Sequence, residues 1–285
     1  MKNQIRLTGF ILLTAALFIS GCGIKFIYNQ LDWMIPWYIE DYVSLNENQE
    51  LLLDQNLTRY LVQHRQQQLP TYAKFFDDIA NMVEDGLSDQ DIDRLFKQTE
   101  QFRIQIFSTI PVSFGDIFLS LNDQQITEIT IKLNHDLDDL TERYIDKKEF
   151  KQRDIRNEEL DKFLEGRLGE LNSKQKNLLE KWAQEYILIG PEFIQSRKLW
   201  QNQLLEVLHQ RHKDNNFQSR LSALFKNRYL GRTKQHQKKI DFNERLLRQL
   251  YLDIDKSMDS YQRQKLVNNI RDYAEDFRLL SNQKL

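Results

Sequence analysis

Apolar residues recur along most of the chain at steps of three and four positions, with charged and amide side chains between them. The three clearest stripes are Leu53, Leu57, Tyr60 and Leu61; Ile126, Ile129, Leu133, Leu137 and Leu140; and Leu266, Ile270, Tyr273, Phe277 and Leu280. Residues three and four apart share one face of an α-helix, so each stripe predicts an amphipathic helix with one buried face. The pattern therefore predicts an all-α fold of about ten helices, packed as successive helical hairpins, with no sheet.

A short motif that starts helices occurs four times. Each copy has an apolar residue, then Asn or Asp, then Gln three positions later. The copies are Leu45, Asn46 and Gln49; Leu121, Asn122 and Gln125; Leu171, Asn172 and Gln175; and Met258, Asp259 and Gln262. This is the pattern of a capping box, in which the Asn or Asp oxygen accepts an N-terminal amide and the Gln side chain bonds back to the capping residue. We expect each cap to stabilise its helix by about 1 kcal/mol.

Proline and glycine predict further helix ends. Pro70 should open a helix that Gly86 ends, and the following helix, capped by Ser88, should stop before Pro111. Pro36 predicts an extended or turn conformation in the segment that contains it. The turns are short, so residues 45–285 form one helical body, with the charged stretch 147–158 as its best candidate for a soft internal boundary.

The first 22 residues have the organisation of a bacterial lipoprotein signal peptide. Lys2 and Arg6 precede an apolar run, and the run ends in the tetrapeptide Ile19, Ser20, Gly21, Cys22. Small residues before a cysteine admit the signal peptidase, and the thiol of Cys22 then carries the lipid, which anchors the chain to a membrane without a spanning helix. Residues 1–21 are thus expected to be removed, leaving 22–44 as an anchor and aromatic-rich lead segment.

The residue after Cys22 predicts the destination. Position 23 is glycine, whereas an aspartate there is the usual signal for retention at the inner membrane of Gram-negative bacteria. We therefore expect an outer-membrane lipoprotein that faces the periplasm.

Composition narrows the class of protein without naming an activity. The 285 residues include nine glycines and four prolines, few enough to favour helices over sheets, and the formal net charge at pH 7 is −2. A near-neutral chain in an exported compartment is not expected to bind nucleic acid. Cys22 is the only cysteine, so the fold is expected to be held by its core without a disulfide.

The segment after Cys22 carries a family resemblance. The run Tyr28 to Val43, then the pair His64 and Arg65, and then the run Leu69 to Tyr72 together resemble an uncharacterised family of Gram-negative lipoproteins, known as a domain of unknown function. The resemblance extends over most of the mature chain and implies no activity. A weaker likeness is that of the Leu-Asn-x-x-Gln motifs to the Leu-Thr-x-x-Gln motif of the Spy-like periplasmic chaperones, which implies a holdase that binds unfolded clients. Asn46 and Asn122 stand where that family has threonine.

Two further segments suggest binding surfaces. The aromatic residues Trp33, Trp37 and Tyr38 fit either a membrane interface or docking onto the helical body, and docking is favoured because residues 26–58 contain six acids and no Lys or Arg. Residues 197–248 carry a net charge of +9. Nine of their basic residues form a candidate face for an anionic lipid, cell-wall carboxylates or an acidic partner, namely Arg211, Lys213, Arg220, Lys226, Arg228, Arg232, Lys234, Lys238 and Lys239. The alternatives are a solvated face or pairing with acids of the same chain.

Catalytic and metal-binding signatures are weak. There is no Gly-x-Ser-x-Gly motif and no glycine-rich phosphate loop, so neither catalytic residues nor a cofactor are predicted. Asp89, Asp91 and Asp93 follow a calcium-loop spacing, but Arg94 stands where that loop needs glycine. His64 lies on an apolar stripe and is expected to be a buried, hydrogen-bonded core residue. The sequence favours a non-enzymatic binding, adaptor or structural lipoprotein with an envelope protein or cell-wall partner; a tethered holdase and a peptidoglycan-cleaving enzyme are the alternatives.

Overall fold

The computed structural model describes residues 22–227 and 229–283, and nearly all of this part of the chain is helical. Its elements are α2 (Cys22–Tyr28), α3 (Leu31–Glu40), α4 (Glu47–Gln67), α5 (Leu69–Asp85), α6 (Asp89–Ser120), α7 (Asp123–Thr141), the π-helix η1 (Glu142–Asp146), α8 (Glu149–Leu168), α9 (Ser173–Glu185), α10 (Gly190–His209), α11 (Phe217–Lys226), α12 (Lys234–Ser257) and α13 (Ser260–Asn282). Within these ranges there is no strand. The predicted all-α fold is confirmed, and twelve α-helices stand against the expected ten or so.

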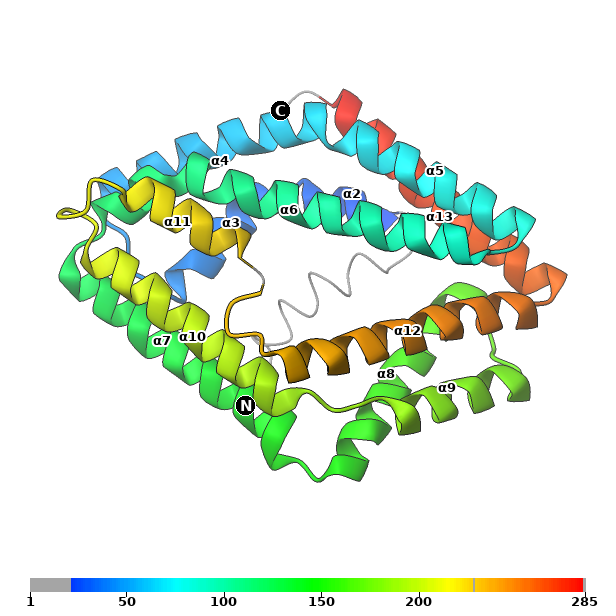
Figure 1. Ribbon diagram of the computed structural model, residues 1–285. Coiled ribbons are helices and arrows are strands. Elements are labelled where there is room, and N and C mark those ends of the chain that lie inside the picture. Colours follow the sequence, from blue (N-terminus) through cyan, green and yellow to red (C-terminus); the bar gives the residue numbers. More distant parts are fainter. Residues whose placement is uncertain (1–21, 228, 284–285) are drawn as a thin grey trace.

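The helices form a frame with three sides, as Figure 1 shows. One side contains α4, α5, α6 and α13, of which α5 and α13 form the most extensive helix pair. The second side pairs α7 with α10, and α11 connects it to α6. The third side contains α8, α9 and α12, and α8 also contacts α13. The frame is therefore closed by contacts between helices far apart in the sequence.

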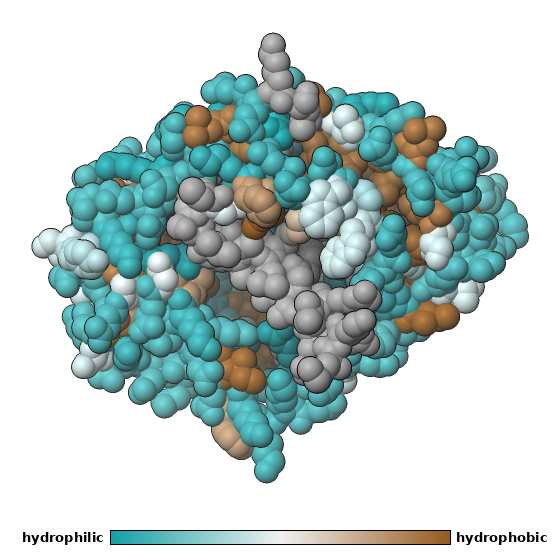
Figure 2. Space-filling view, turned by 180° about the vertical axis from the view of Figure 1, so that it is seen from behind, coloured by the Kyte–Doolittle hydropathy of each residue, from teal (hydrophilic) through white to brown (hydrophobic). Residues whose placement is uncertain are grey.

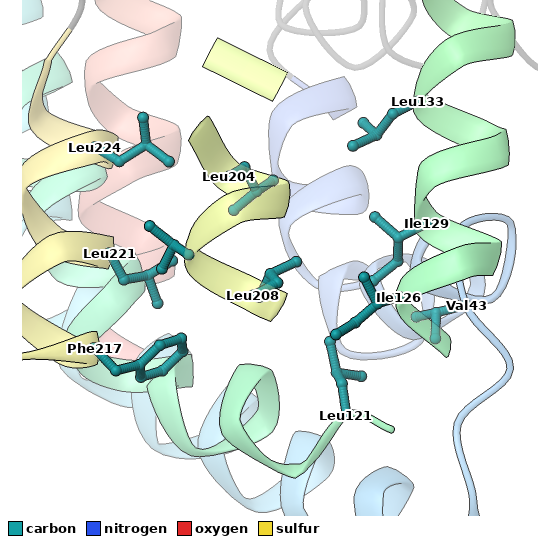
Figure 3. Close-up of a cluster of buried hydrophobic side chains, with 11 residues drawn as sticks. Val43, Leu121, Ile126, Ile129, Leu133, Leu204, Leu208, Phe217, Leu221 and Leu224 are labelled. Carbon is teal, nitrogen blue, oxygen red and sulfur yellow. The ribbon is translucent and has the colours of Figure 1, made fainter. Parts of the chain in front are cut away.

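Each side is held by its own buried cluster rather than by one common core. The cluster in Figure 3 joins α7, α10 and α11 through side chains such as Ile126, Leu208 and Leu221, each of them fully buried. A second cluster, around Leu168 and Leu179, joins α8, α9 and α12. Two more hold α5 and α13 together, one of which includes residues of α2. The predicted boundary at residues 147–158 covers the end of the η1–α8 turn and the first half of α8.

Two helix breaks predicted from proline are wrong. α6 continues through Pro111 to Ser120, and α3 contains Pro36. An internal proline costs a helix about 3 kcal/mol because it removes an amide donor and crowds the preceding turn. At Pro111 tertiary contacts offset that cost: its ring is fully buried, and the amide of Gln218 in α11 donates to its carbonyl at 2.5 Å. Gly115, one turn later, leaves the space that the Gln218 side chain occupies.

Candidate functional site

The lead segment, which sequence analysis connected with membrane anchoring, begins with a helix fixed to the body. Cys22 is the first residue of α2; Ile19, Ser20 and Gly21 lie outside the described residues. Ile24 and Tyr28, four positions apart on α2, are both buried in the cluster formed with α5 and α13. The described part of the chain therefore has no linker between position 22 and the packed body.

An ion pair also fastens α2 to α13. Lys25 Nζ lies 3.1 Å from the carboxylate of Asp276, whose side chain is almost completely buried. Burial raises the pKa of Asp276, although Lys25 beside it acts in the opposite direction. A buried carboxylate is costly to leave without a cation, so the pair strongly favours the docked position of α2.

Arg65 of α4 makes the second attachment. Its guanidinium donates to the side-chain oxygen of Asn29, just after α2, at 3.1 Å and to the carbonyl of Leu280 near the end of α13 at 3.3 Å. It also lies 5.0 Å from the centre of the Tyr28 ring, within cation–π range. Arg65 is only 4% exposed, so its charge is used inside the fold to join three segments.

His64, next to Arg65, lies in an aromatic cluster that includes Tyr28, Tyr60 and Tyr72. The Tyr28 hydroxyl is 3.0 Å from Nδ1 of His64, and the Tyr72 hydroxyl is 3.4 Å from Nε2. Burial lowers the pKa of His64 to about 4 and raises that of Tyr72 to about 12. The predicted hydrogen bonds of His64 are present, but its side chain is only partly buried at the edge of the core. The cluster keeps its imidazole neutral at physiological pH.

The aromatic residues of the lead segment divide between the body and the solvent. Tyr28 is buried, and the hydroxyl of Tyr42 donates to Asp136 of α7 at 2.6 Å. In contrast, Trp33 is 55% exposed and Trp37 48%, and no residue of α3 is buried. The expected docking onto the body is thus wrong for the two tryptophans.

The Leu-Asn-x-x-Gln motifs are joined in pairs at the ends of helices. The first three form complete capping boxes, with reciprocal bonds between Asn46 and Gln49, Asn122 and Gln125, and Asn172 and Gln175. In the fourth copy Asp259 accepts from the amide of Gln262, but no bond back from the glutamine is formed. The side chain of Gln262 is instead bonded to Gln175 of the third copy.

Two junctions result, each built from a pair of buried glutamines. Gln49 pairs with Gln125 and also donates to the carbonyl of Ser120, while Gln125 donates to the carbonyl of Ser44. Gln175 pairs with Gln262 in the same way through reciprocal bonds of 2.8 and 3.1 Å. The first junction ties the start of α4 to the start of α7, and the second ties α9 to α13. The apolar residues Leu121 and Leu171 beside them are buried.

The predicted basic face is only partly a surface. Arg211 is 6% exposed, and its guanidinium bonds the carbonyl of Leu121 and the carboxylate of Asp123, so its assignment to an exposed face is wrong. Arg220 pairs with Glu206 and Asp214, and Lys239 pairs with Glu192. Arg232 bonds Gln237. Arg228 lies outside the described residues, and four exposed lysines complete the set: Lys213, Lys226, Lys234 and Lys238.

Several acids are used for structure. Asp255 is buried, accepts the amide of Leu87 at 3.1 Å and pairs with Arg263 at 2.9 Å.

In the part of the chain that the structure describes, no three His, Cys, Asp or Glu side chains come together as a metal site. None of the described helices is long and apolar enough to cross a membrane.

Sequence reasoning overlooked Lys25, Arg65 and Asp276. The one available signal was that Lys25 is the last basic residue before the acidic stretch 26–58, which marks it for pairing within the chain. The partners of Asp276 and Arg65, Lys25 and Asn29, became apparent only from the packing of α2.

Comparison with known protein families gives a match. A family of unknown function, DUF6279, matches residues 41–237, more than half of the sequence. The chain belongs to this family. The resemblance to an uncharacterised family is confirmed, although the match begins only after most of the aromatic segment. Comparisons with curated proteins and with solved structures give no match.

Proposed function

We propose that this DUF6279 protein is an outer-membrane lipoprotein, anchored through acylated Cys22 and facing the periplasm, with a non-enzymatic adaptor or structural role. The observation that carries the proposal is that Cys22, the residue that the signal-peptide pattern marks for acylation, is already part of α2. The helix begins at Cys22 and is fastened to α13 by the Lys25–Asp276 pair, so a lipid at that position would hold the body next to the membrane in a defined orientation.

The buried carboxylates of this protein form ion pairs that hold the fold together, which supports a role without catalysis. The two buried carboxylates are paired with cations of other helices: Asp255 with Arg263 and Asp276 with Lys25. A glycosidase needs a pair of carboxyls free to act as acid and base. The tethered holdase is a weaker alternative, since the likeness to the chaperone motif is accounted for by the buried glutamine junctions, which stabilise the fold.

Lipidation and sorting are tested with two substitutions. In cells labelled with an alkyne fatty acid, Cys22→Ala should carry no label and stay as the unprocessed precursor, while the parent chain is labelled and shortened. Gly23→Asp should remain labelled and move from the outer-membrane to the inner-membrane fraction. A Cys22→Ala protein that is shortened and soluble in the periplasm would overturn the anchoring proposal.

The partner is tested by photo-crosslinking in intact cells. Probes replace the exposed Lys213, Lys226 and Lys238, and matched probes replace Lys162 and Lys181, which are exposed on α8 and α9 outside the basic region. One recurrent envelope protein captured only by the first set supports an adaptor. A broad range of misfolded exported proteins captured by both sets would favour the holdase instead.

A further inference from the structure

We propose that an exposed aromatic face on α2 and α3 inserts into the interfacial layer of a bilayer composed mainly of zwitterionic lipid. The aromatic face is defined as Phe26, Trp33 and Trp37, whose side chains are 68%, 55% and 48% exposed. The inference deepens the proposed function, because it assigns the surface that lies against the membrane when Cys22 is acylated.

The outward direction of these rings follows from the inward direction of their neighbours. Ile24 and Tyr28 on α2 are buried in the body, and Phe26, midway between them, lies on the opposite side of the helix. On α3, Trp33 and Trp37 are four positions apart and so share one face. Leu31 and Ile39, at the two ends of α3, pack against separate buried clusters. The segment thus bridges two parts of the body and keeps the three rings outside.

The attachments of α2 prevent these rings from being buried by a small shift of the segment. Lys25 is bonded to Asp276, Asn29 to Arg65, and Tyr28 to His64. In Figure 1, α2 lies behind α6, so it belongs to the side that Figure 2 turns toward the viewer, and α3 extends from there to below α6. On that side, residues of intermediate and high hydropathy interrupt the hydrophilic surface.

Lipid is the occupant that the position of the face favours. Phe26 lies one helical turn after position 22, about 6 Å along the axis of α2, so an acyl chain on Cys22 would bring the face to the bilayer surface. Tryptophan is enriched at membrane interfaces because its ring is apolar and its N–H remains bonded near the headgroups. The Trp33 N–H already bonds Gln30 on the surface of the segment.

The acidic residues near the aromatic face favour lipids without a net negative charge. Asp32, Glu40, Glu47 and Glu50 are exposed close by in the sequence, and the charge of Lys25 is directed to Asp276. Anionic headgroups would be repelled by the acids and find no lysine or arginine between residues 26 and 58. Phosphatidylethanolamine and phosphatidylcholine carry no net charge and avoid this repulsion.

The test uses the mature chain, residues 22–285 with Cys22→Ser, so that no lipid is attached. Among the described residues, the first member of any of the four buried clusters is Ile24, so this chain retains every described member of them. Co-flotation is measured with vesicles of phosphatidylethanolamine and phosphatidylcholine, and with vesicles containing phosphatidylglycerol. We expect binding to the zwitterionic vesicles with a blue shift of the tryptophan fluorescence, and weaker binding when phosphatidylglycerol is added at low salt.

Two double variants decide whether the aromatic face is responsible. W33S/W37S should bind the zwitterionic vesicles at least tenfold more weakly at unchanged thermal stability. The control F150S/Y261S removes two aromatic residues that are 56% and 71% exposed elsewhere, and should bind like the parent. Equal losses in both variants, binding that requires phosphatidylglycerol, or no binding by the parent would overturn the proposal.

A second copy of the chain is the competing occupant. Sedimentation of the parent without vesicles should give a monomer at all concentrations; self-association that W33S/W37S abolishes would assign the face to a dimer interface and overturn the lipid assignment. The membrane contact of the aromatic face and the lipidation of Cys22 can be refuted independently of each other. The vesicle test uses unlipidated protein, and the labelling test does not depend on the tryptophans.

Discussion

Gln49 and Gln125 exchange two hydrogen bonds through their side-chain amides, although 76 positions separate them. The Nε2 of Gln49 donates to Oε1 of Gln125 at 3.1 Å, and the return bond is 2.6 Å long. Both residues are 4% exposed. The second proton of the Gln49 amide goes to the carbonyl of Ser120, and that of the Gln125 amide to the carbonyl of Ser44. Each side-chain oxygen also accepts the backbone amide of its own capping asparagine. Every donor and acceptor of this buried pair is therefore satisfied, the condition under which a polar pair specifies a packing arrangement.

The first prediction concerns this pair. Gln125→Leu should lower the free energy of unfolding by about 1–3 kcal/mol, because one amide proton of buried Gln49 loses its acceptor and the carbonyl of Ser44 loses its donor. Gln49→Leu should cost a similar amount, and the double variant less than the sum, as two leucines leave fewer unpaired groups. Urea unfolding of the four proteins measures the coupling. Gln124→Leu on the exposed side of the same turn is the control; equal costs at positions 124 and 125 would contradict the role of the junction.

The second prediction separates capping from pairing. Asn122→Ala should destabilise by about 1 kcal/mol, since the side chain of Asn122 caps α7 by accepting the amide of Gln125. Asn122→Ser supplies another good capping oxygen and should restore most of this loss, as measured by thermal unfolding. Partner capture in cells should be unchanged in both variants. Loss of capture at unchanged stability would instead favour a binding role for the motif.

The third prediction is a dependence of stability on pH. The pKa of His64 is lowered to about 4 in the folded protein, from about 6.5 when unfolded. Between these values the unfolded chain binds a proton that the folded chain does not, so stability is fully present above pH 6.5 and falls as pH drops toward 4. The expected loss is roughly 3 kcal/mol.

His64→Gln keeps a neutral group that bonds Tyr28 and Tyr72 and should reduce the difference in unfolding free energy between pH 7 and pH 4. His135→Gln, whose histidine is exposed on α7, should leave that difference as in the parent. An unchanged pH profile for His64→Gln would show that other groups control acid unfolding.

The fourth prediction concerns a close backbone approach. A Cβ added at Gly190 would lie 2.2 Å from the carbonyl oxygen of Tyr144, so α10 starts against the π-helix η1. Gly190→Ala must displace backbone and should cost about 1–3 kcal/mol in chemical unfolding. Gly166→Ala, inside α8 with no neighbour within 4 Å, should stabilise by about 0.5–1 kcal/mol. Equal effects at the two glycines would contradict the close contact.

The sequence by itself determined the helices and most of their ends. The three-four spacing around residues such as Leu57 and Ile270 needs only the period of the helix, and the caps at Asn46, Ser88 and Asn122 act within four residues of the chain. Local signals failed where distant packing opposed them. α6 runs through Pro111, whose ring is fully buried and whose carbonyl accepts from Gln218, over 100 positions away.

Only the tertiary structure decided which helix ends meet and which aromatic rings stay outside. Sequence shows four capping motifs but not that Gln49 faces Gln125 and Gln175 faces Gln262, since a reciprocal amide pair depends on the position of two chain segments in space. For the same reason, the sequence could not distinguish buried Arg211 from exposed Lys213, or buried Tyr28 from exposed Trp37. Spacing along one helix fixes a face; what covers that face depends on the rest of the fold.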